Sequence, residues 1–309
     1  DERFRIVKPI GEGTMGAVFI AIDGETGQPV ALKVLKKSEA AMRARERFSR
    51  EIRFLETLAH PNVVNLIQHG RDAKIGVQYF AMELLFGDPI SKLTASGRSS
   101  PALALMVARQ AAEGIATAHE LGIVHRDLKP ANLMLVPLKS GDVQEKILDN
   151  GLAYAISEER LTELGNAPGT VSYMPPEQLQ GIDVDHRGDL YGLGVVLFEM
   201  LTGRSPFPGT TQVEIARSVL DLPAKRLDEI VPEVPAALAD LVASLLAKRP
   251  EDRPRDAEEL VGQIASFQRS SALRPITVKH AGPSLDPARD WQLDARLSID
   301  DVRPEARGG

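Results

Sequence analysis

Apolar positions recur in short runs along the first third of the chain and in longer helical stripes after it. The short runs lie between polar or glycine-containing turns, have the length and composition of strands, and cover residues 4–10, 17–22, 29–35, 63–67 and 77–82. Residues 39–58 differ, because Phe48, Ile52 and Leu55 repeat at helical spacing. The pattern predicts five strands and one helix for this region.

From residue 101 to about residue 268 the pattern is mainly helical. Residues 102–120 carry one strong apolar stripe, and residues 189–201 are almost wholly apolar, which predicts a helix buried on most faces. Further helices are predicted at 211–220, 235–246 and 256–267, and two short strands at 133–136 and 145–148. Periodicity is lost beyond residue 270, as is typical of a poorly ordered tail. We therefore predict three parts, at residues 1–83, 84–268 and 269–309.

The amino-acid composition of the chain argues against several classes of function. The 309 residues carry a net charge of −6, which argues against nucleic-acid binding by bulk electrostatics. The chain has no cysteine, so disulfides, thiolate catalysis and Cys-ligated zinc are excluded, and a reducing cytoplasm is expected. No apolar run is long enough to span a bilayer. The chain begins at Asp1 without a methionine, as expected of a segment of a longer protein, so a membrane-tethered parent is left open.

Two stretches carry recognisable chemistry. In the stretch 125–132, Asp127 and Asn132 can face one small volume from a single loop, which suits deprotonation of a hydroxyl beside a metal-bound phosphate. The glycine turn at residues 11–16 lies between two predicted strands rather than before a helix. This context argues against a Rossmann phosphate turn and favours a hairpin that covers a ligand.

The string His125-Arg126-Asp127-Leu128-Lys129-Pro130-Ala131-Asn132 resembles the H-R-D-x-x-x-x-N catalytic loop of protein kinases. The chain from about residue 4 to 268 resembles the bacterial Ser/Thr kinases that are related to eukaryotic kinases. The resemblance implies an α+β fold with two lobes: a small lobe with a five-stranded antiparallel sheet and one main helix, and a larger, mainly helical lobe. The implied activity is ATP- and Mg²⁺-dependent transfer of a γ-phosphoryl group to Ser or Thr of protein substrates.

The resemblance also implies roles for single residues. Lys33 would contact the α- and β-phosphates and pair with Glu51, for which Glu46 and Glu56 are competitors. The backbone of Glu83 and Leu85 would bind the adenine. The full implied nucleotide site is Ile10, Gly11, Glu12, Gly13, Thr14, Met15, Gly16, Val18, Ala31, Lys33, Met82, Glu83, Leu85 and Met134.

For catalysis, the resemblance implies that Asp127 orients the substrate hydroxyl and that Lys129 neutralises charge on the transferring group. Asn132 and Asp149 would ligate Mg²⁺, or Mn²⁺ in its place, because both offer hard oxygen donors. Lys129 at its position is typical of Ser/Thr kinases rather than tyrosine kinases.

The sequence departs from the family at Asp149-Asn150-Gly151, where kinases have Asp-Phe-Gly. Asn150 loses the apolar burial of the aromatic ring that normally packs beside the loop histidine, here His125. Neighbouring apolar groups or a water can compensate. The alternative is a pseudokinase-like scaffold that binds nucleotide and turns over poorly, although retention of Lys33, Asp127, Asn132 and Asp149 argues against it. A small-molecule kinase is disfavoured, because a full activation segment ends in Pro175-Pro176-Glu177.

The remaining implied residues lie in or near the activation segment. Thr162 is the first candidate phosphorylation site and Ser157 the second, while Thr170 would line the site next to the acceptor residue. Structural roles are implied for four residues: Arg126 as a cation for an activation-segment anion, Asp189 as an acceptor for the backbone of the catalytic loop, and Glu177 as the partner of Arg253. Expected partners are ATP and protein substrates, and a kinase homodimer is left open.

Overall fold

The computed structural model describes residues 3–12, 16–35, 58–72, 76–138, 140, 142–148 and 170–270. These residues fall into two compact units. The first unit contains the described residues up to 35 and those of 65–86, and the second contains residues 58–64 and 87–270 with the gaps just given. In the described residues, no helix is both long enough and apolar enough to cross a membrane.

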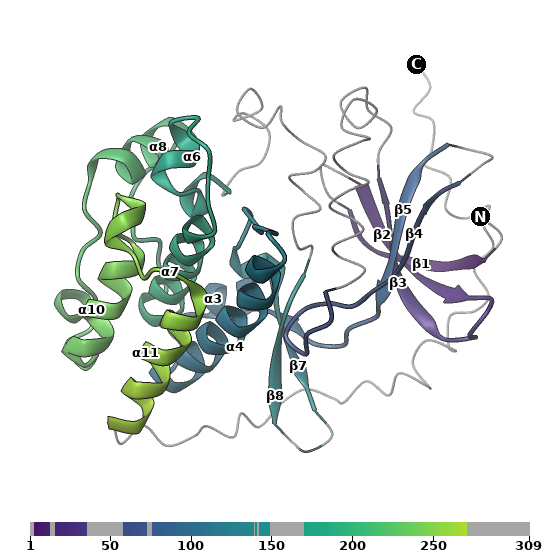
Figure 1. Ribbon diagram of the computed structural model, residues 1–309, viewed down its shortest axis with the longest axis horizontal. Helices are drawn as coiled ribbons and strands as arrows, with labels where there is room; N and C mark the ends of the chain where they lie inside the picture. Colours follow the sequence, from purple (N-terminus) through teal and green to yellow (C-terminus); the bar gives the residue numbers. More distant parts are fainter. Residues whose placement is uncertain are drawn as a thin grey trace. The chain divides into compact units, whose positions relative to one another are not determined.

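The first unit is a five-stranded antiparallel sheet in the order β1-β2-β3-β5-β4 (Figure 1). Its strands are β1 (Phe4–Glu12), β2 (Gly16–Asp23), β3 (Pro29–Leu35), β4 (Leu66–Arg71) and β5 (Gln78–Glu83). The five-stranded sheet predicted from the apolar pattern is confirmed. The predicted strand at 63–67 is wrong in its first half, because Val63 forms an isolated parallel bridge with Ile147 of the second unit.

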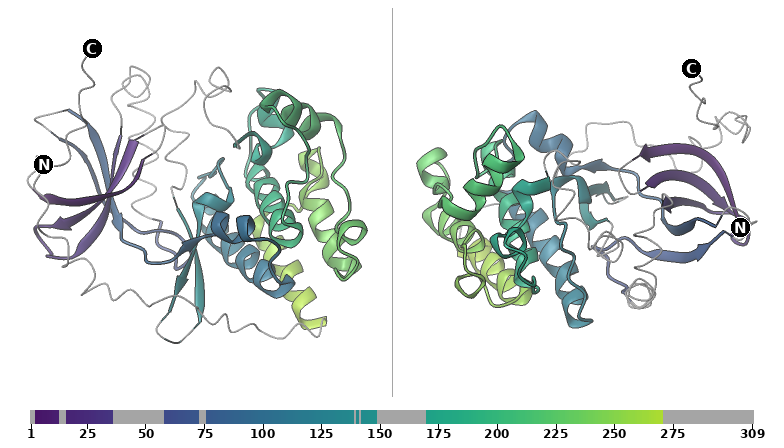
Figure 2. Two further views of the ribbon diagram at one scale, coloured as in Figure 1. Left: turned by 180° about the vertical axis from the view of Figure 1, so that it is seen from behind. Right: turned by 90° about the horizontal axis from the view of Figure 1, so that it is seen from above.

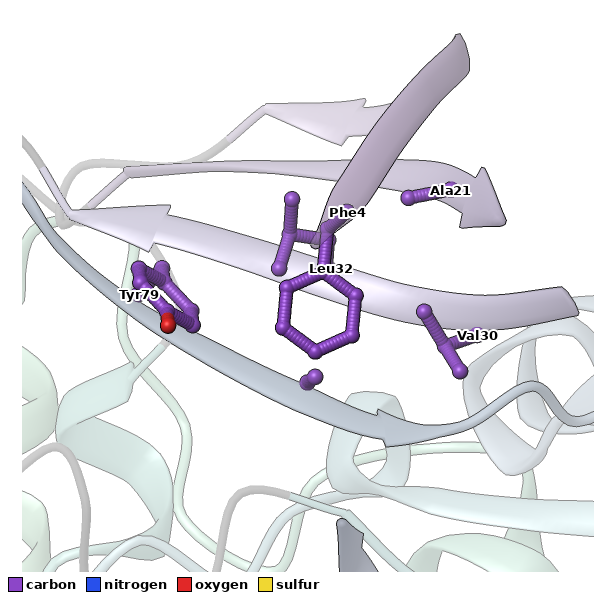
Figure 3. Packing of buried hydrophobic residues seen from close by; sticks show 6 residues of the cluster. Phe4, Ala21, Val30, Leu32 and Tyr79 are labelled. Atoms are coloured by element: carbon purple, nitrogen blue, oxygen red, sulfur yellow. The ribbon is translucent and has the colours of Figure 1, made fainter. Parts of the chain in front are cut away.

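One face of this sheet is packed by Phe4, Ala21, Val30, Leu32, Tyr79 and Ala81 (Figure 3). The rings of Phe4 and Tyr79 meet edge to face with their centroids 5.7 Å apart. Since side chains alternate along a strand, the residues between these core positions project from the opposite face. Lys33 lies on that opposite face, directly across from Val18 on β2 and Phe80 on β5.

The second unit is mainly helical (Figure 2). It contains α3 (Ile90–Ser96), α4 (Pro101–Glu120), α6 (Pro176–Leu179), α7 (Arg187–Thr202), α8 (Gln212–Asp221), α9 (Leu227–Ile230), α10 (Ala236–Leu245) and α11 (Ala257–Ser270), with 3-10 turns η1 (Pro130–Asn132), η3 (Thr170–Tyr173) and η4 (Pro250–Asp252). Helix α7 packs against both α4 and α10. Its long apolar run is buried as predicted, and Gly203, at a φ of 72°, ends it in the left-handed conformation that glycine favours. The short helices α3, α6 and α9 were not predicted, because their few residues show no periodicity.

A small antiparallel sheet in the order β6-β7-β8 completes the second unit (Figure 1). It is formed by β6 (Asp88–Pro89), β7 (Leu133–Pro137) and β8 (Val143–Ile147), and β8 packs against α4. The backbone of residues 62–64 continues this arrangement: Ile147 donates its N–H to Asn62 O at 2.9 Å, and Ile147 O accepts the N–H of Val64 at 2.9 Å. The two short strands predicted at 133–136 and 145–148 are confirmed as β7 and β8.

Candidate active site

The loop between α4 and β7 is held by one carboxylate. Asp189, in the first turn of α7, is 1% exposed, and its two oxygens accept the backbone N–H groups of His125 at 2.8 Å and Arg126 at 2.7 Å. Arg126 has a φ of 61° and is the one non-glycine residue with positive φ in the described part of the chain. That conformation costs energy for a residue with a Cβ, and the two hydrogen bonds to Asp189 offset it.

Asp189 remains ionised in this buried position. Burial alone would raise its pKa, but the hydrogen bonds from His119 and from the backbone N–H of His125 outweigh burial and lower the pKa below its ordinary value. His119 Nε2 lies 2.8 Å from Asp189 Oδ2. The sequence reading missed His119 as a member of the site, because nothing local in the sequence signals a contact with a residue 70 positions away.

The hydrogen bonds of His125 fix its tautomer. Its Nε2 lies 3.0 Å from Leu148 O, which can only accept, so Nε2 carries the proton. Its Nδ1 accepts the N–H of Asp127 at 3.3 Å, so Nδ1 carries none. Both ring nitrogens of this buried histidine therefore support the loop that carries Asp127.

Two polar side chains converge on the Asp127 carboxylate. Lys129 Nζ lies 3.1 Å and 2.9 Å from its two carboxylate oxygens, and the Asn132 amide nitrogen donates to Asp127 Oδ2 at 3.1 Å and to its backbone oxygen at 2.8 Å. The Asp127 and Lys129 side chains are 9% and 19% exposed, so both retain a path to solvent. The loop thus presents an oriented carboxylate next to a cation.

Asn132 is suited to hold a cation. Its amide nitrogen is committed to Asp127, so Oδ1 is the atom that it can offer to a metal ion. Amide and carboxylate oxygens are the ligands that Mg²⁺ prefers. Asp149, the second expected ligand, lies outside the described residues. Within the described ranges, no group of three or more His, Asp or Glu side chains is arranged to hold a metal.

The structure brings Glu177 and Arg253 together as expected. Arg253 Nη1 and Nη2 lie 2.7 Å from Glu177 Oε1 and Oε2, a bidentate pair whose side chains are 0% and 7% exposed. The same guanidinium donates to the carbonyl oxygens of Arg187, Ala247 and Lys248. This pair ties the segment at the start of α6 to the turn before α11.

The first unit gathers several of the expected nucleotide residues on one face. Ala31 lies across from Met82, and Lys33 lies across from Val18, so all four project from the same side of the sheet. Gly16 sits so close to β3 that a Cβ there would lie 2.1 Å from Val34 O. Ile10, Gly11 and Glu12 form the end of β1, and the N–H of Glu83 donates to Asn65 O at 3.0 Å. Leu85 follows β5, and Met134 lies on β7 of the second unit.

Several expected site residues lie outside the described residues: Gly13, Thr14, Met15, Glu51, Asp149, Asn150, Ser157 and Thr162. Thr170 begins the 3-10 turn η3. The roles expected of these residues stay predictions.

Several bacterial proteins that carry the same type of name match most of this chain. The chain is 34% identical over 293 residues to serine/threonine-protein kinase pkn2 of Myxococcus xanthus. The match covers 93% of this chain and 35% of pkn2. The chain is 35% identical to serine/threonine-protein kinase PrkC of Bacillus subtilis and 34% identical to serine/threonine-protein kinase PknA of Mycobacterium tuberculosis, covering 85% and 86% of this chain and 40% and 61% of those proteins. The chain thus spans between about a third and three fifths of the length of these relatives.

The fold agrees with a solved structure, that of the PknI kinase domain of Mycobacterium tuberculosis. The TM-score is 0.68 at 26% sequence identity, and the match covers 85% of this chain and 96% of that domain. The two-lobed α+β fold implied by the sequence resemblance is therefore confirmed. Residues 4–263 match the family described as protein kinase domain, which is most of the chain. The chain belongs to the protein kinase domain family, and its relatives include bacterial Ser/Thr kinases.

Proposed function

We propose that this chain is an ATP- and Mg²⁺-dependent protein serine/threonine kinase. The observation that carries the proposal is the Asp127 carboxylate, which Lys129 and Asn132 hold on a loop anchored by Asp189. A carboxylate oriented in this way can accept a hydroxyl proton, and the adjacent ammonium can stabilise negative charge on a phosphoryl group. The names of the bacterial relatives support the same activity.

In the proposed reaction, the hydroxyl oxygen of a substrate Ser or Thr forms a bond to the γ-phosphorus of ATP. The bond from that phosphorus to the β–γ bridging oxygen breaks, ADP leaves with its electron pair, and the hydroxyl proton passes to Asp127. Lys129, whose Nζ is 2.9 Å from the Asp127 carboxylate, is placed to neutralise charge on the transferring oxygens. The metal supplies charge neutralisation on the phosphates, and Asn132 and Asp149 would hold it.

On the nucleotide side, we assign Lys33 to the α- and β-phosphates, with Glu51 as its partner. Lys33 projects from the face of the first sheet that also carries Val18, Ala31 and Met82, and it is 9% exposed. This face offers apolar side chains for a base and one cation for phosphate, which is the combination that a nucleotide requires.

The proposed substrates are cytoplasmic proteins with Ser or Thr acceptors, and the activation segment of the kinase itself. Thr162 and Ser157 are the candidate autophosphorylation sites. A phosphate there would carry between one and two negative charges near neutral pH and can pair with Arg126, which stands next to Asp127 in the loop.

Mass spectrometry of the purified chain after incubation with Mg-ATP tests the activity and finds the phosphorylated residues. Asp127→Asn should abolish phosphate incorporation and leave ATP affinity within about threefold, because the carboxylate acts on the hydroxyl rather than on the nucleotide. Asp183→Asn, at an exposed acid before α7, is the matched control and should retain activity. Phosphate transfer that survives Asp127→Asn would refute the proposal. ATP binding without transfer in the wild type, relieved by Asn150→Phe, would instead identify an impaired scaffold.

A further inference from the structure

Glu145 is an acidic residue in an apolar position. It lies at the centre of β8, directly across from Leu135 on β7, and between Val143 and Ile147 on the same face of the strand. Its side chain is 0% exposed, and neither carboxyl oxygen has a hydrogen-bond partner in the part of the chain that the structure describes. An unpaired ionised carboxylate is very costly in such a place, whereas a protonated carboxyl costs far less.

In the part of the chain that the structure describes, neither β7 nor α4 offers this carboxyl a countercharge. Strand β7 carries no titratable residue. On α4, Arg109 pairs with Glu113 at 2.8 Å, His119 contacts Asp189, and Glu120 is exposed at the helix end. His60, in the segment before β4, has its pKa lowered by burial and so stays neutral near pH 7. Burial raises the pKa of Glu145 well above its ordinary value, and neighbouring Lys146 opposes this only weakly.

The backbone around Glu145 connects it to two other parts of the unit. Gln110 Oε1, on α4, accepts the N–H of Glu145 at 2.6 Å, and Asn62 Nδ2 donates to Glu145 O at 2.7 Å. Glu145 is therefore the point at which β8 is joined both to α4 and to the segment at residues 62–64.

Leu148, three residues after Glu145, forms two hydrogen bonds to the catalytic loop. The N–H of Leu148 donates to Asn132 O at 2.8 Å, and Leu148 O accepts the proton of His125 Nε2 at 3.0 Å. The position of β8 thus sets the position of His125 and Asn132, which in turn hold Asp127.

We propose that Glu145 is a positioning residue, which keeps β8 and through Leu148 the catalytic loop in place only while its carboxyl carries a proton. Its ionisation in alkaline solution places a charge between β8 and α4, where neither carboxyl oxygen has a hydrogen-bond partner among the described residues, and drives the strand away from the helix. Where the test reads out phosphate transfer, the inference rests on the proposed kinase activity.

The test compares the wild type with Glu145→Gln, which has the same shape and cannot ionise. Two quantities are followed from neutral to alkaline pH: phosphate transfer, and the hydrogen-exchange protection factors of the amides of Asn132, Ile147 and Leu148. In the wild type both should fall together, by about tenfold per pH unit once the carboxyl ionises, since a single proton is lost. In Glu145→Gln both should stay flat through the same range.

Gln144→Glu is the matched control. It adds an acid to the half-buried neighbouring position on the other face of β8 and should leave the protection profile of the wild type unchanged. If Glu145→Gln does not fold, Glu145→Leu takes its place, because an apolar side chain of similar size suits the surroundings. Failure of both variants to fold would overturn the proposal, as would profiles of wild type and Glu145→Gln that coincide. A wild type that transfers no phosphate at any pH, yet shows the Glu145-dependent loss of protection, would refute the kinase activity and retain this inference.

Discussion

Asp189 Oδ1 accepts the backbone N–H of Arg126 at 2.7 Å, and Arg126 adopts a left-handed backbone conformation with a φ of 61°. The carboxylate on α7 therefore selects the backbone geometry of the residue that precedes Asp127. Through this contact, the buried helix α7 orients the side chain of Asp127.

Asp189→Asn is expected to remove much of this control. The amide has a single oxygen in place of two, so one of the N–H groups of His125 and Arg126 loses its acceptor while buried. Loss of one buried acceptor lowers the unfolding free energy by about 1–3 kcal/mol. The rate of phosphate transfer should also fall, by more than the smaller folded fraction explains, because Asp127 is misplaced. Urea unfolding and initial rates measure the two effects, and Asp183→Asn should change neither. Full activity in Asp189→Asn would contradict the assigned role.

Removing only one charge of the ion pair between Glu177 and Arg253 should cost more stability than removing both. Arg253→Met leaves the Glu177 carboxylate buried without its bidentate partner, which is expected to cost about 3–5 kcal/mol of stability. The double variant Glu177→Gln with Arg253→Met should regain part of that loss. Arg249→Met, which removes an ion pair with an arginine side chain that is 70% exposed, should cost less than about 1 kcal/mol. Additive losses in the double variant would show that the two side chains do not act as a pair.

Two glycines of the glycine-rich turn should respond differently to alanine. A Cβ at Gly16 would lie 2.1 Å from Val34 O, so Gly16→Ala must push β2 away from β3. A cost of about 1–3 kcal/mol is expected from such overpacking. A Cβ at Gly11 meets nothing within 4 Å, so Gly11→Ala should preserve stability. Chemical denaturation distinguishes the two, and equal losses would show that β2 and β3 are not paired in the register found here.

Lys248 predicts a rise of stability with pH. Burial, aided by the charge of Arg253, lowers its pKa to about 8 from the ordinary lysine value of 10.5. The unfolded chain therefore binds this proton more tightly than the folded chain does, and stability rises as pH increases from about 8 towards about 10. Above about pH 10, ionisation of tyrosines in the unfolded chain acts in the opposite direction. Between pH 8 and 9.5, the unfolding midpoint of the wild type should therefore rise relative to that of Lys248→Met, whereas groups that both proteins share, such as Glu145, shift both midpoints alike. A slope unaffected by Lys248→Met would assign it to another group.

Replacing Asn132 should reduce activity to a degree that depends on the metal concentration. Asn132→Ala removes an oxygen ligand and should raise the Mg²⁺ concentration for half-maximal activity by at least about tenfold. Titration with Mg²⁺ and with Mn²⁺ checks this, and Asp183→Asn, at an exposed acid before α7, should leave the metal requirement unchanged. Recovery of part of the activity at high Mg²⁺ is the expected signature of a lost ligand, because the hydrogen bonds from Asn132 to Asp127 stay missing at any metal concentration.

The apolar pattern predicted the sheet of the first unit and the long helices of the second, because local periodicity reports which face of an element is buried. It failed at Val63, whose neighbours read as strand although its backbone partner is Ile147, 84 positions later. Periodicity also could not place Glu145: its residue type indicates a solvent-facing position, and only the packing of β8 against α4 shows that it is buried.

For the site, the catalytic loop and the ion pair of Glu177 and Arg253 were reached through family resemblance rather than through local patterns. The contacts of His119 with Asp189 and of His125 with Leu148 join residues 70 and 23 positions apart, and no short motif encodes them. Such partners depend on tertiary packing, which sequence reading does not provide.

The pairing of Asn62 and Val64 with Ile147 also constrains the order in which the chain can acquire its structure during synthesis. All five strands of the first sheet lie before residue 84, and each pairs with a strand within that stretch. The segment at residues 62–64, although made early, must wait until the ribosome has released residue 147 before its backbone finds its partner. The strands of the first sheet can therefore pair on the nascent chain while the backbone of residues 62–64 still lacks its partner at residue 147.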